Sequence, residues 1–572
     1  MMKYPRLTAF FALLMLLPSQ GLADRVPEEK ARQLAENFLR MKPISVTTPL
    51  TRGHEAPEFY IYSAPLARSF VIISGEDTVQ PILAYSRESA FPERDLPRNL
   101  EWWLEEIARG IDHFRKQGTK QSAAMAALWT PTRALSVEPK VVLELETAKW
   151  DQREPYNLLC PVIDGKNTLT GCMATSFAII LRYHKWPDKG EGIAKGYRYD
   201  GGTVPDLVLG HEYDWENMPL VYDHSTPEQN AAVSRLMYDL CVLSEAEFGL
   251  EGTPGYNVPA MIGIQDHMKY SKNAKIYSYD FFSHETWIEM IQRELREVGP
   301  VSYTGQSNTD GHAFVIDGYD DHDNFHINWG WGGLSDGYFT IPDFGIYSSD
   351  HVAIFGIKKD EGVKPQEAVL LLDYGIWNWY NEPMVQGRTI SAAIASVYSV
   401  DTETVQGLVS FGVADKNYKL KELLGEPFEV NLSQYGSSEF PMQTCSIQGD
   451  ITHGDRLMVF FKGGRSGEWV PLFNYWGGRG SARQKSVIYE IPLSNPDLME
   501  EASLSFNVES NLLTIKLPQE ATWTLTLKGQ EVKSGKSDQL EATISLAGLE
   551  NGEYVLTLLG ETGAKSSVTL TL

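Results

Sequence analysis

Residues 170–187 read Thr-Gly-Cys-Met-Ala-Thr-Ser-Phe-Ala-Ile-Ile-Leu-Arg-Tyr-His-Lys-Trp-Pro, and the rest of the chain is organised around this stretch. A loop that closes at Gly171 delivers Cys172 to the first turn of a predicted helix, and Pro187 ends that helix. Most positions from Met173 onward are apolar, which is typical of a helix at the centre of a domain. A helix N-terminus favours a thiolate and can hold an oxyanion. Cys172 is therefore predicted to be a nucleophile.

A cysteine nucleophile needs a base, and His312 is the best candidate among the 12 histidines of the chain. It follows the loop 307–311 and opens a strand-like run, so its ring can project from a strand end beside a cleft. It lies 312 − 172 = 140 residues after Cys172, and papain-like enzymes place these two residues about 130–150 apart. His326 and His351, which lie in or next to predicted strands, are the rivals for this role.

Two further stretches offer groups that such a site needs. Gln152 precedes Cys172 by 20 residues, and its side-chain amide could donate to an oxyanion beside the Cys172 backbone N–H. The run 328–333, Asn-Trp-Gly-Trp-Gly-Gly, follows His312 and offers an amide to orient the imidazole and tryptophans to shield it. Taken singly, a loop glutamine or asparagine is usually a turn residue. Only the joint order of Gln, Cys, His and Trp-Gly favours a catalytic set.

The sequence gives little support for a metal site, a nucleotide site or nucleic-acid binding. We therefore expect no cofactor and no metal. The sequence has no Cys-x-x-Cys and no Walker-type loop. The His-Glu pairs at residues 54–55, 211–212 and 284–285 each lack the second histidine of a zinc-binding helix. The formal net charge is −25 without a basic block, which argues against nucleic acid and anionic membrane surfaces as partners.

The chain has four cysteines, too few for a disulfide scaffold of this length: Cys160, Cys172, Cys241 and Cys445. Cys241 falls on the apolar face of a predicted helix, which predicts a buried thiol. A bridge between Cys160 and Cys172 is the alternative to a nucleophilic Cys172, but it would leave His312 unexplained.

Residues 1–23 have the pattern of a secretory signal peptide. Lys3 and Arg6 precede an apolar run over residues 7–17, and small residues follow at 21–23. No later stretch approaches the roughly 18 apolar residues of a transmembrane helix. We therefore expect an exported protein, secreted or at the cell surface, without a transmembrane span.

Residues 24–136 form the first predicted domain of the mature chain. Amphipathic helices are expected over residues 28–39 and 99–116, with three strand-like runs between them. The end of this unit, residues 118–137, is polar and contains proline, so it is expected to be an exposed linker open to proteolysis.

The remaining chain divides into three predicted parts. Residues 137–360 place helices first and antiparallel strands later, which indicates an α+β domain with two lobes. Residues 361–495 and 496–572 are strand after strand and are expected to be β-sandwich domains.

Several stretches between about residues 137 and 358 jointly resemble the streptopain family of bacterial cysteine peptidases, in the papain-like clan. The stretches are Gln152 with Pro-Tyr-Asn-Leu-Leu at 155–159, Pro-Val-Ile at 161–163, Thr-Gly-Cys-Met-Ala-Thr at 170–175, Tyr-His-Lys-Trp-Pro at 183–187, Gly-His-Ala-Phe-Val-Ile-Asp-Gly at 311–318, His-Ile-Asn-Trp-Gly-Trp-Gly-Gly at 326–333 and Ser-Asp-Gly-Tyr-Phe at 335–339.

The resemblance implies a papain-like fold of a helical and a β lobe. It also implies roles for individual residues: Cys172 as nucleophile, His312 as base, Gln152 as oxyanion donor and Trp329 beside the histidine. Asn328 is one residue off the Asn-x-Trp-Gly pattern of papain-like enzymes, so its orienting role stays open. We expect three further residues to border the substrate: Ser307, Gly311 and Trp331.

The resemblance extends beyond the central domain. Residues 70–75 and 81–86 resemble the inhibitory propeptide of the family, which implies a zymogen cut within residues 118–137. The last segment, residues 546–572, resembles the sorting or Ig-like tails of exported Bacteroidetes-type proteins, although it lacks a basic ending. Export machinery would then be a partner of the C-terminal domain.

The sequence thus predicts a secreted cysteine endopeptidase made as a zymogen. Its partners would be protein or peptide substrates, with its own propeptide as an intramolecular inhibitor. One alternative is an amidase or acyltransferase of the same clan, which would not fragment a denatured protein. Another is a surface adhesin with a secondary enzyme domain, whose β modules over residues 365–572 would bind host material by themselves.

Overall fold

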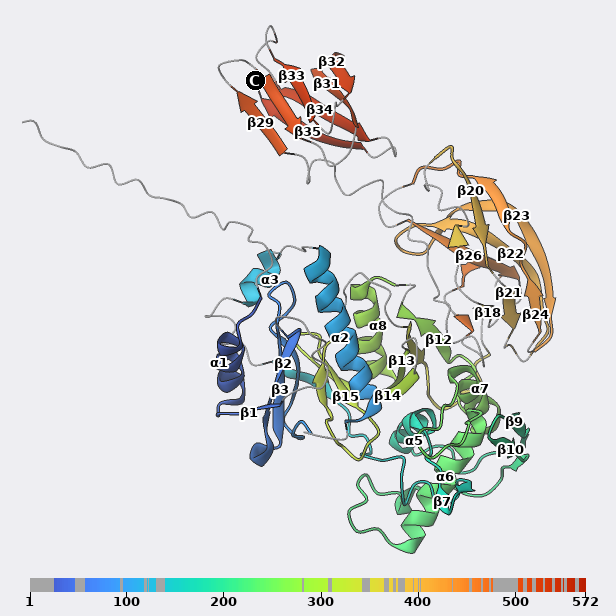
Figure 1. The fold of residues 1–572 in the computed structure, drawn as a ribbon. Coiled ribbons are helices and arrows are strands. Elements are labelled where there is room, and N and C mark those ends of the chain that lie inside the picture. Colours follow the sequence, from blue (N-terminus) through green and yellow to red (C-terminus); the bar gives the residue numbers. More distant parts are fainter. Residues whose placement is uncertain are drawn as a thin grey trace, which may run out of the picture. The chain divides into compact units, whose positions relative to one another are not determined.

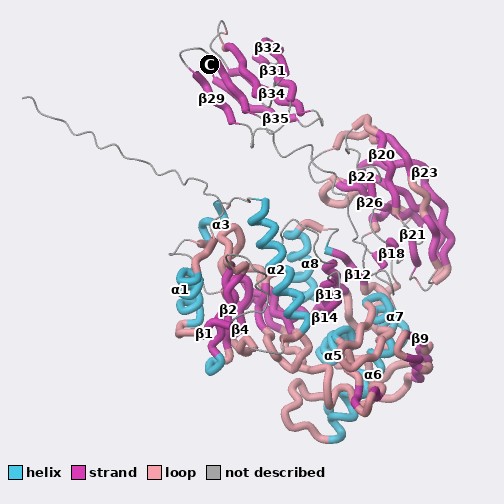
Figure 2. Tube along the Cα trace, in the orientation of Figure 1, coloured by secondary structure: helices cyan, strands magenta, loops and turns pink. Residues whose placement is uncertain are grey.

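The computed structural model divides into two compact units, residues 1–363 and 364–572 (Figures 1 and 2). The residues that it describes are 25–46, 57–92, 96–117, 121, 123–129, 139–279, 282–306, 311–341, 350–364, 370–373, 377–378, 386–394, 396–399, 401, 403–434, 436–451, 455–463, 467–472, 475–476, 503–507, 512–516, 521–527, 530–536, 541–546, 549, 553–560 and 565–571. The predicted signal peptide, Ser307 and the predicted boundary near residue 495 lie outside them.

One antiparallel sheet runs through the first unit. Along it lie, in spatial order, β1 (Ile44–Val46), β2 (Phe59–Ala64), β3 (Ser69–Ser74), β4 (Ile82–Ser86), β16 (Gly337–Phe339), β15 (Phe325–Asn328), β14 (Gly311–Asp320), β13 (Val301–Gln306), β17 (Asp350–Phe355) and β12 (Lys275–Ser278), with β5 (Val141–Glu144) on β14. The two domains predicted for residues 24–136 and 137–360 therefore share one sheet. They join where Tyr85 pairs with Tyr338 and Ala84 with Phe339.

Apolar side chains cover both faces of this sheet, because successive strand residues point to opposite sides. One face packs against α2 (Arg98–Gln117) and α8 (His284–Glu297), which lie side by side over it (Figure 1). The other face packs against α1 (Glu28–Leu39) and Trp129. In β3, Phe70 and Ile72 point to the first face and Val71 and Ile73 to the second. This double coverage explains why β3 is buried throughout.

The helical part of the first unit consists of α5 (Cys172–His184), α6 (Pro227–Leu243) and α7 (Asn257–His267), which pack against one another. A capping box between Thr226 and Gln229 starts α6. On its other side α5 contacts β13 and β14, and the hydroxyls of Ser176 and Ser302 are 2.9 Å apart. Because α5 lies between helices and sheet, it is buried from Met173 to Leu181.

Short elements complete this unit. They are the strand pairs β6 (Val162–Ile163) with β7 (Lys166–Asn167), β8 (Ile193–Ala194) with β11 (Leu207–Val208) and β9 (Tyr197–Tyr199) with β10 (Gly202–Val204), and the 3-10 turns η1 (Pro65–Ala67) and η2 (Trp215–Asn217).

The linker predicted over residues 118–137 is partly structured. It contains a helix, α3 (Ala123–Leu128), and Trp129 after it is buried and donates its indole N–H to the Val79 carbonyl at 2.8 Å. The expectation of an exposed linker is therefore wrong for these residues, because an apolar anchor holds them on the sheet. The rest of the linker lies largely outside the described residues.

In the second unit the described residues form strands and loops only (Figure 2). The first group is β18 (Leu370–Asp373), β19 (Trp377–Asn378), β20 (Thr389–Ala393), β21 (Ser396–Ser399), β22 (Val405–Ala414), β23 (Leu420–Leu432), β24 (Ser437–Glu439), β25 (Gln443–Ser446), β26 (Arg456–Gly463), β27 (Trp469–Pro471) and β28 (Tyr475–Trp476). The second group is β29 (Ser503–Asn507), β30 (Leu512–Lys516), β31 (Ala521–Leu527), β32 (Gln530–Lys536), β33 (Glu541–Ser545), β34 (Glu553–Gly560) and β35 (Lys565–Thr571).

Helices and antiparallel sheets in the first unit, with strands alone in the described part of the second, agree with the expected mixture of α and β structure. Among the described helices, none combines the length and the apolar character needed to cross a membrane.

Candidate active site

Cys172 is the first residue of α5, and the backbone before it explains why it starts the helix there. Gly171 has φ of 83°, and a Cβ at this position would lie 2.1 Å from the Thr253 carbonyl oxygen, so only glycine fits. The Gly171 carbonyl accepts hydrogen bonds from the Thr175 backbone N–H at 3.1 Å and from its hydroxyl at 2.8 Å. The half-buried Cys172 thus stands where the first helical N–H groups have no partner within the helix.

Strand β14 brings His312 to the same place. The backbone N–H of Ala313 donates to the Cys172 Sγ at 3.4 Å. The contact joins residues 141 positions apart in the sequence. The structure therefore brings together Cys172 and the strand that carries His312.

The two rival histidines lie elsewhere. His326, on β15, pairs with Gly318, six residues along β14 from His312, which corresponds to about 20 Å of strand. His351, on β17, is buried, and its Nδ1 is 2.9 Å from the Tyr303 hydroxyl. Burial lowers the pKa of His351 to about 4, so this ring is a neutral part of the core.

Gln152 and the turn after β15 lie close to the start of α5. Gln152 is buried, and its carbonyl accepts from the Thr170 N–H at 3.1 Å, two residues before Cys172. The Gly332 N–H donates to the Trp150 carbonyl at 2.9 Å, and a Cβ on Gly330 would lie 3.2 Å from the Thr175 methyl group. The turn over residues 329–333 is therefore packed against the loop that carries Gln152.

The residues of this turn have different environments. The fully buried Trp329 donates its indole N–H to the Ser335 carbonyl at 3.1 Å, and its ring centroid lies 5.0 Å from that of Phe314. Trp331 is partly exposed, with the Arg153 guanidinium 4.7 Å above its ring.

Asn328 holds the turn together through both ends of its amide. Its nitrogen donates to the Thr147 hydroxyl at 3.1 Å and to the Ala148 carbonyl at 2.9 Å, and its oxygen accepts from the Gly330 N–H at 3.1 Å. These bonds give Asn328 a structural role in the turn. Of the residues expected to border substrate, Gly311 is exposed at the start of β14, and Ser307 lies outside the described residues.

All four cysteines are free thiols, so the alternative bridge between Cys160 and Cys172 is wrong. The prediction of a buried Cys241 is confirmed: its thiol donates to the Thr170 carbonyl at 3.1 Å. Burial, followed by the nearby Cys160 thiol, raises the pKa of Cys241 well above its ordinary value, which makes it unreactive.

The start of α2 is a part of the site that the sequence did not indicate. The Asn99 side chain donates to the Trp329 carbonyl at 2.7 Å and to the Ala313 carbonyl at 3.4 Å. The Trp102 ring covers Gly305, where a Cβ would lie 2.0 Å from its Cζ2. Gly305 is the residue that pairs with His312. Trp102 is buried because its ring lies over Gly305 of β13 and near Phe314 of β14.

Comparisons with known proteins match both parts of the first unit. Residues 150–339 match the model of the peptidase C10 family. Residues 150–339 are therefore a region of the peptidase C10 type. Residues 23–111 match the Spi protease inhibitor model, so the C10 region follows a region of the inhibitor type. The predicted resemblance to streptopain-type peptidases is confirmed.

Two curated relatives illustrate the relationship of this chain to known proteins. The thiol protease/hemagglutinin PrtT of Porphyromonas gingivalis is 29% identical over 398 residues, which cover 64% of this chain and 45% of PrtT. Streptopain of Streptococcus pyogenes is 29% identical over 303 residues, which cover 49% of this chain and 73% of streptopain. The matched part of this chain therefore spans less than half the length of PrtT.

Solved structures of Prevotella intermedia proteins also match. The prointerpain A fragment is 28% identical, covers 54% of this chain and 99% of its own, and has a TM-score of 0.45. Active interpain A is 30% identical, covers 38% and 95%, and has a TM-score of 0.35.

Proposed function

We propose that this chain is an exported cysteine endopeptidase that is made as a zymogen and cleaves protein or peptide substrates. The observation that carries the proposal is the meeting of Cys172, at the start of a buried helix, with Ala313, the neighbour of His312, at 3.4 Å. No cofactor or metal is needed. The helices α5 to α7 and the sheet around β14 would be the two lobes of a papain-like domain.

The reaction follows from the chemistry of these side chains. The Cys172 thiolate, paired with the His312 imidazolium, attacks the carbonyl carbon of the substrate and forms a C–S bond. The N–H groups at the start of α5 and the Gln152 amide hold the oxyanion. His312 gives its proton to the leaving amine, and the acyl group remains as a thioester. His312 then takes a proton from water, whose oxygen attacks the thioester and releases the acid and the thiolate.

The contacts of α2 support inhibition by the propeptide. Residues paired across antiparallel strands project from the same face, so His312 shares a face with Gly305 and Phe314, the face that Trp102 covers. Asn99 ties the start of α2 to the carbonyls beside this histidine. Bound α2 would therefore keep the His312 ring on the face of the sheet that α2 covers. Its departure frees the imidazole to face Cys172 and opens the cleft, which Gly311, Ser307 and Trp331 would border.

The remaining regions have proposed roles in export and processing. Residues 1–23 would direct export to the cell surface or the medium. Maturation would cut residues 118–137 outside α3, since an extended segment fits a peptidase cleft better than a helix. Residues 361–495 and 496–572 would be β-sandwich domains, the second acting as a sorting or Ig-like domain for the export machinery.

The test compares the wild-type chain with Cys172→Ala. The wild type is expected to lose its N-terminal region, to fragment a denatured protein and to be labelled at Cys172 by an irreversible thiol-directed peptide probe. Cys172→Ala should stay full-length and inactive, whereas the control Cys445→Ala, at a buried thiol of the second unit, should behave as the wild type. Self-processing by Cys172→Ala would refute the proposal.

A second comparison tests the base and separates the enzyme classes. His312→Ala should lose labelling at Cys172, and the control His322→Ala, at an exposed pair with Asp321, should keep it. An amidase or acyltransferase would be labelled in the same way but would leave the denatured protein intact.

A further inference from the structure

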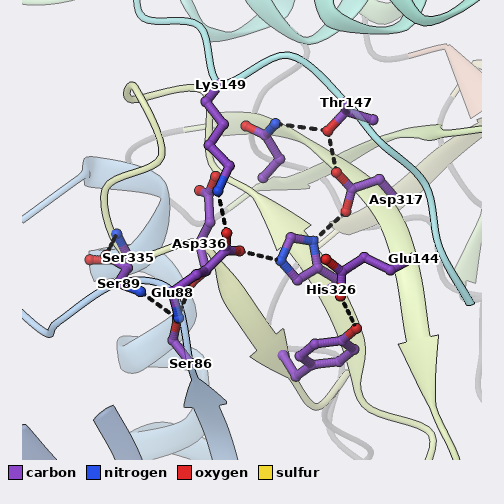
Figure 3. Close-up of polar contacts among 12 residues, drawn as sticks. Ser86, Glu88, Ser89, Glu144, Thr147, Lys149, Asp317, His326, Ser335 and Asp336 are labelled. Carbon is purple, nitrogen blue, oxygen red and sulfur yellow. Dashed lines mark hydrogen bonds and ion pairs between the residues drawn. The ribbon is translucent and has the colours of Figure 1, made fainter. Parts of the chain in front are cut away.

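A cluster of charged side chains, separate from the candidate active site, lies where β4 meets the β15–β16 pair (Figure 3). The His326 Nδ1 is 2.5 Å from an Asp317 carboxylate oxygen, and its Nε2 is 2.7 Å from the Glu88 Oε1. The other Glu88 oxygen accepts from the Lys149 Nζ. Glu88 belongs to the inhibitor region and the other three residues to the peptidase side of the sheet. One inhibitor carboxylate thus bridges two basic groups of the peptidase.

This cluster is built into the molecule. The side chains of His326 and Asp317 are 7% and 2% exposed, while those of Lys149 and Glu88 are 36% and 32% exposed. Burial raises the pKa of Glu88, but hydrogen bonds and charge from His326 and then Lys149 outweigh it and lower this pKa to about 2. Burial lowers the pKa of His326, but Asp317 and Glu88 raise it well above the ordinary value. The bridge is therefore fully charged at neutral pH.

Removal of Glu88 would leave the peptidase side of the cluster unbalanced. Asp317 neutralises one positive charge, which leaves the other on His326 or Lys149. Burial raises the pKa of the neighbouring Asp336 to about 7, against the charge of His326, which lowers it. Its Oδ2 is buried and has no hydrogen-bond partner among the described residues. The fourth carboxylate nearby, Glu144, accepts from the Tyr338 hydroxyl at 2.6 Å.

The vacated groups would be costly to leave without a partner. A buried charged donor that loses its acceptor costs more than a neutral one, and a new carboxylate restores both charge-assisted bonds. The partly exposed Lys149 lets a ligand enter.

The backbone beside the cluster accepts an extended chain. In the structure β4 pairs with β16, the Ser86 hydroxyl donates to the Asp336 carbonyl at 2.6 Å, and the Ser335 N–H donates to the Ser89 hydroxyl at 2.8 Å. Departure of the inhibitor region would expose this edge of β16, where an extended peptide can add as a strand. The place is about 20 Å along β14 from His312, so it is separate from the catalytic centre.

We propose that His326 and Lys149 form a carboxylate-binding site of the mature peptidase. Glu88 fills it in the zymogen, and an acidic side chain of an extended peptide, added to the β16 edge, fills it after the inhibitor region leaves. The site would favour substrates that carry an acidic residue at this distance from the cleaved bond. The proposal rests on the proposed function only for the departure of the inhibitor region.

The first test uses the full chain with Cys172→Ala, so that its outcome is independent of catalysis. In this background Glu88→Ala leaves room for formate, a small carboxylate. The melting temperature is measured in sodium formate and in sodium chloride of equal ionic strength. Formate is expected to raise it saturably by about 2 °C more than chloride, because a ligand stabilises the state that binds it.

Three controls decide this test. The parent chain should show no effect specific to formate because Glu88 fills the site, and Glu88→Gln should show none because the amide occupies the space. Adding Lys149→Ala to Glu88→Ala should remove most of the effect. Equal responses of all variants, or no difference between formate and chloride, would overturn the proposal.

The second test uses the processed enzyme with its thiol blocked by iodoacetamide. A fluorescent peptide with the sequence of residues 82–89, Ile-Leu-Ala-Tyr-Ser-Arg-Glu-Ser, is compared by anisotropy with the same peptide carrying Glu88→Gln. We expect the glutamate peptide to bind about 10-fold more tightly, and Lys149→Ala to abolish this preference. Equal binding of the two peptides, or a preference that survives Lys149→Ala, would contradict the site. If no processed enzyme forms, the proposed function fails while the formate test still stands.

Discussion

The inhibitor region contacts the peptidase region at several places, and two of these contacts differ in their chemistry. At the start of α2, the neutral side chains of Asn99 and Trp102 lie on backbone groups of β13, β14 and the turn after β15. At the end of β4, the Glu88 carboxylate lies between Lys149 and His326. The first contact depends on shape, since it exists only because Gly305 has no side chain. The second depends on charge.

This difference separates two properties of the proposed zymogen. A neutral contact keeps its strength over a wide range of pH and salt concentration, whereas a charged contact changes with both. The contact near His312 therefore makes inhibition robust. The contact at Glu88 makes retention of the inhibitor region sensitive to conditions.

Trp102→Ala should have the largest effect, because it removes a buried indole and leaves a cavity over Gly305. We expect the first unit to lose about 3–5 kcal/mol of stability. In the Cys172→Ala background, calorimetry should show a lower first melting transition, and in the wild-type background processing should become faster. Phe114→Ala, at a partly buried position near the other end of α2, is the matched control and should lose less. An unchanged melting transition would show that the Trp102 contact does not stabilise the first unit.

Glu88→Gln should have an intermediate effect. Loss of two charge-assisted hydrogen bonds costs about 1–2 kcal/mol at pH 6, towards the lower end of the usual range because Glu88 is partly exposed. Glu88 has a lowered pKa, so its contribution is present above pH 4.5 and is lost as pH falls towards 2. His326 has a raised pKa, so its contribution is present below pH 6.5 and is lost as pH rises through the raised value.

The measurement for Glu88 is a series of melting curves of the inactive chain with and without Glu88→Gln. The difference between the two should be largest near pH 5–6 and should shrink towards low pH. A difference that stays constant from pH 3 to pH 6 would show that the carboxylate contributes through its shape alone.

Asn99→Ala should have the smallest effect of the three. It removes a donor to the Trp329 and Ala313 carbonyls, which corresponds to about 1 kcal/mol. Because no titratable group takes part in these bonds, its effect should be the same at pH 4 and pH 8. The same melting series measures it, with Asn99→Asp as a comparison that introduces a charge. A strong pH dependence of Asn99→Ala would mean that the two contacts are not independent.

Local sequence patterns predicted the elements that have a clear apolar periodicity or clear start and stop residues. The helix expected over residues 28–39 has these bounds in the structure, and α5 starts at Cys172 as expected. The sequence did not reveal α7, because nearly every position around Ile262 is buried and Pro259 interrupts the pattern, so no amphipathic period exists. The sequence also did not reveal α3, because an apolar run of six residues inside a polar linker is too short to show a helical periodicity.

In the candidate site too, local sequence patterns identified single residues but not the contacts between residues that are far apart in the chain. Residue type and helix position selected Cys172, and spacing selected His312 over its rivals. The partnership of Glu88 with His326 joins residues 238 positions apart and depends on the register between β4 and β16. No local pattern encodes that register. The sequence indicates His326 only as a rival base, although its strand position is what gives it charged partners.

The pairing of β4 with β16 also has a consequence for synthesis. Tyr85 and Tyr338 are 338 − 85 = 253 residues apart, so at about 5–20 residues per second the partner strand emerges from the ribosome about 13–50 s later. During that interval β4 is a bare strand edge in the nascent chain. The inhibitor region is therefore synthesised before the last strands of the peptidase, and it offers the edge to which β16 adds.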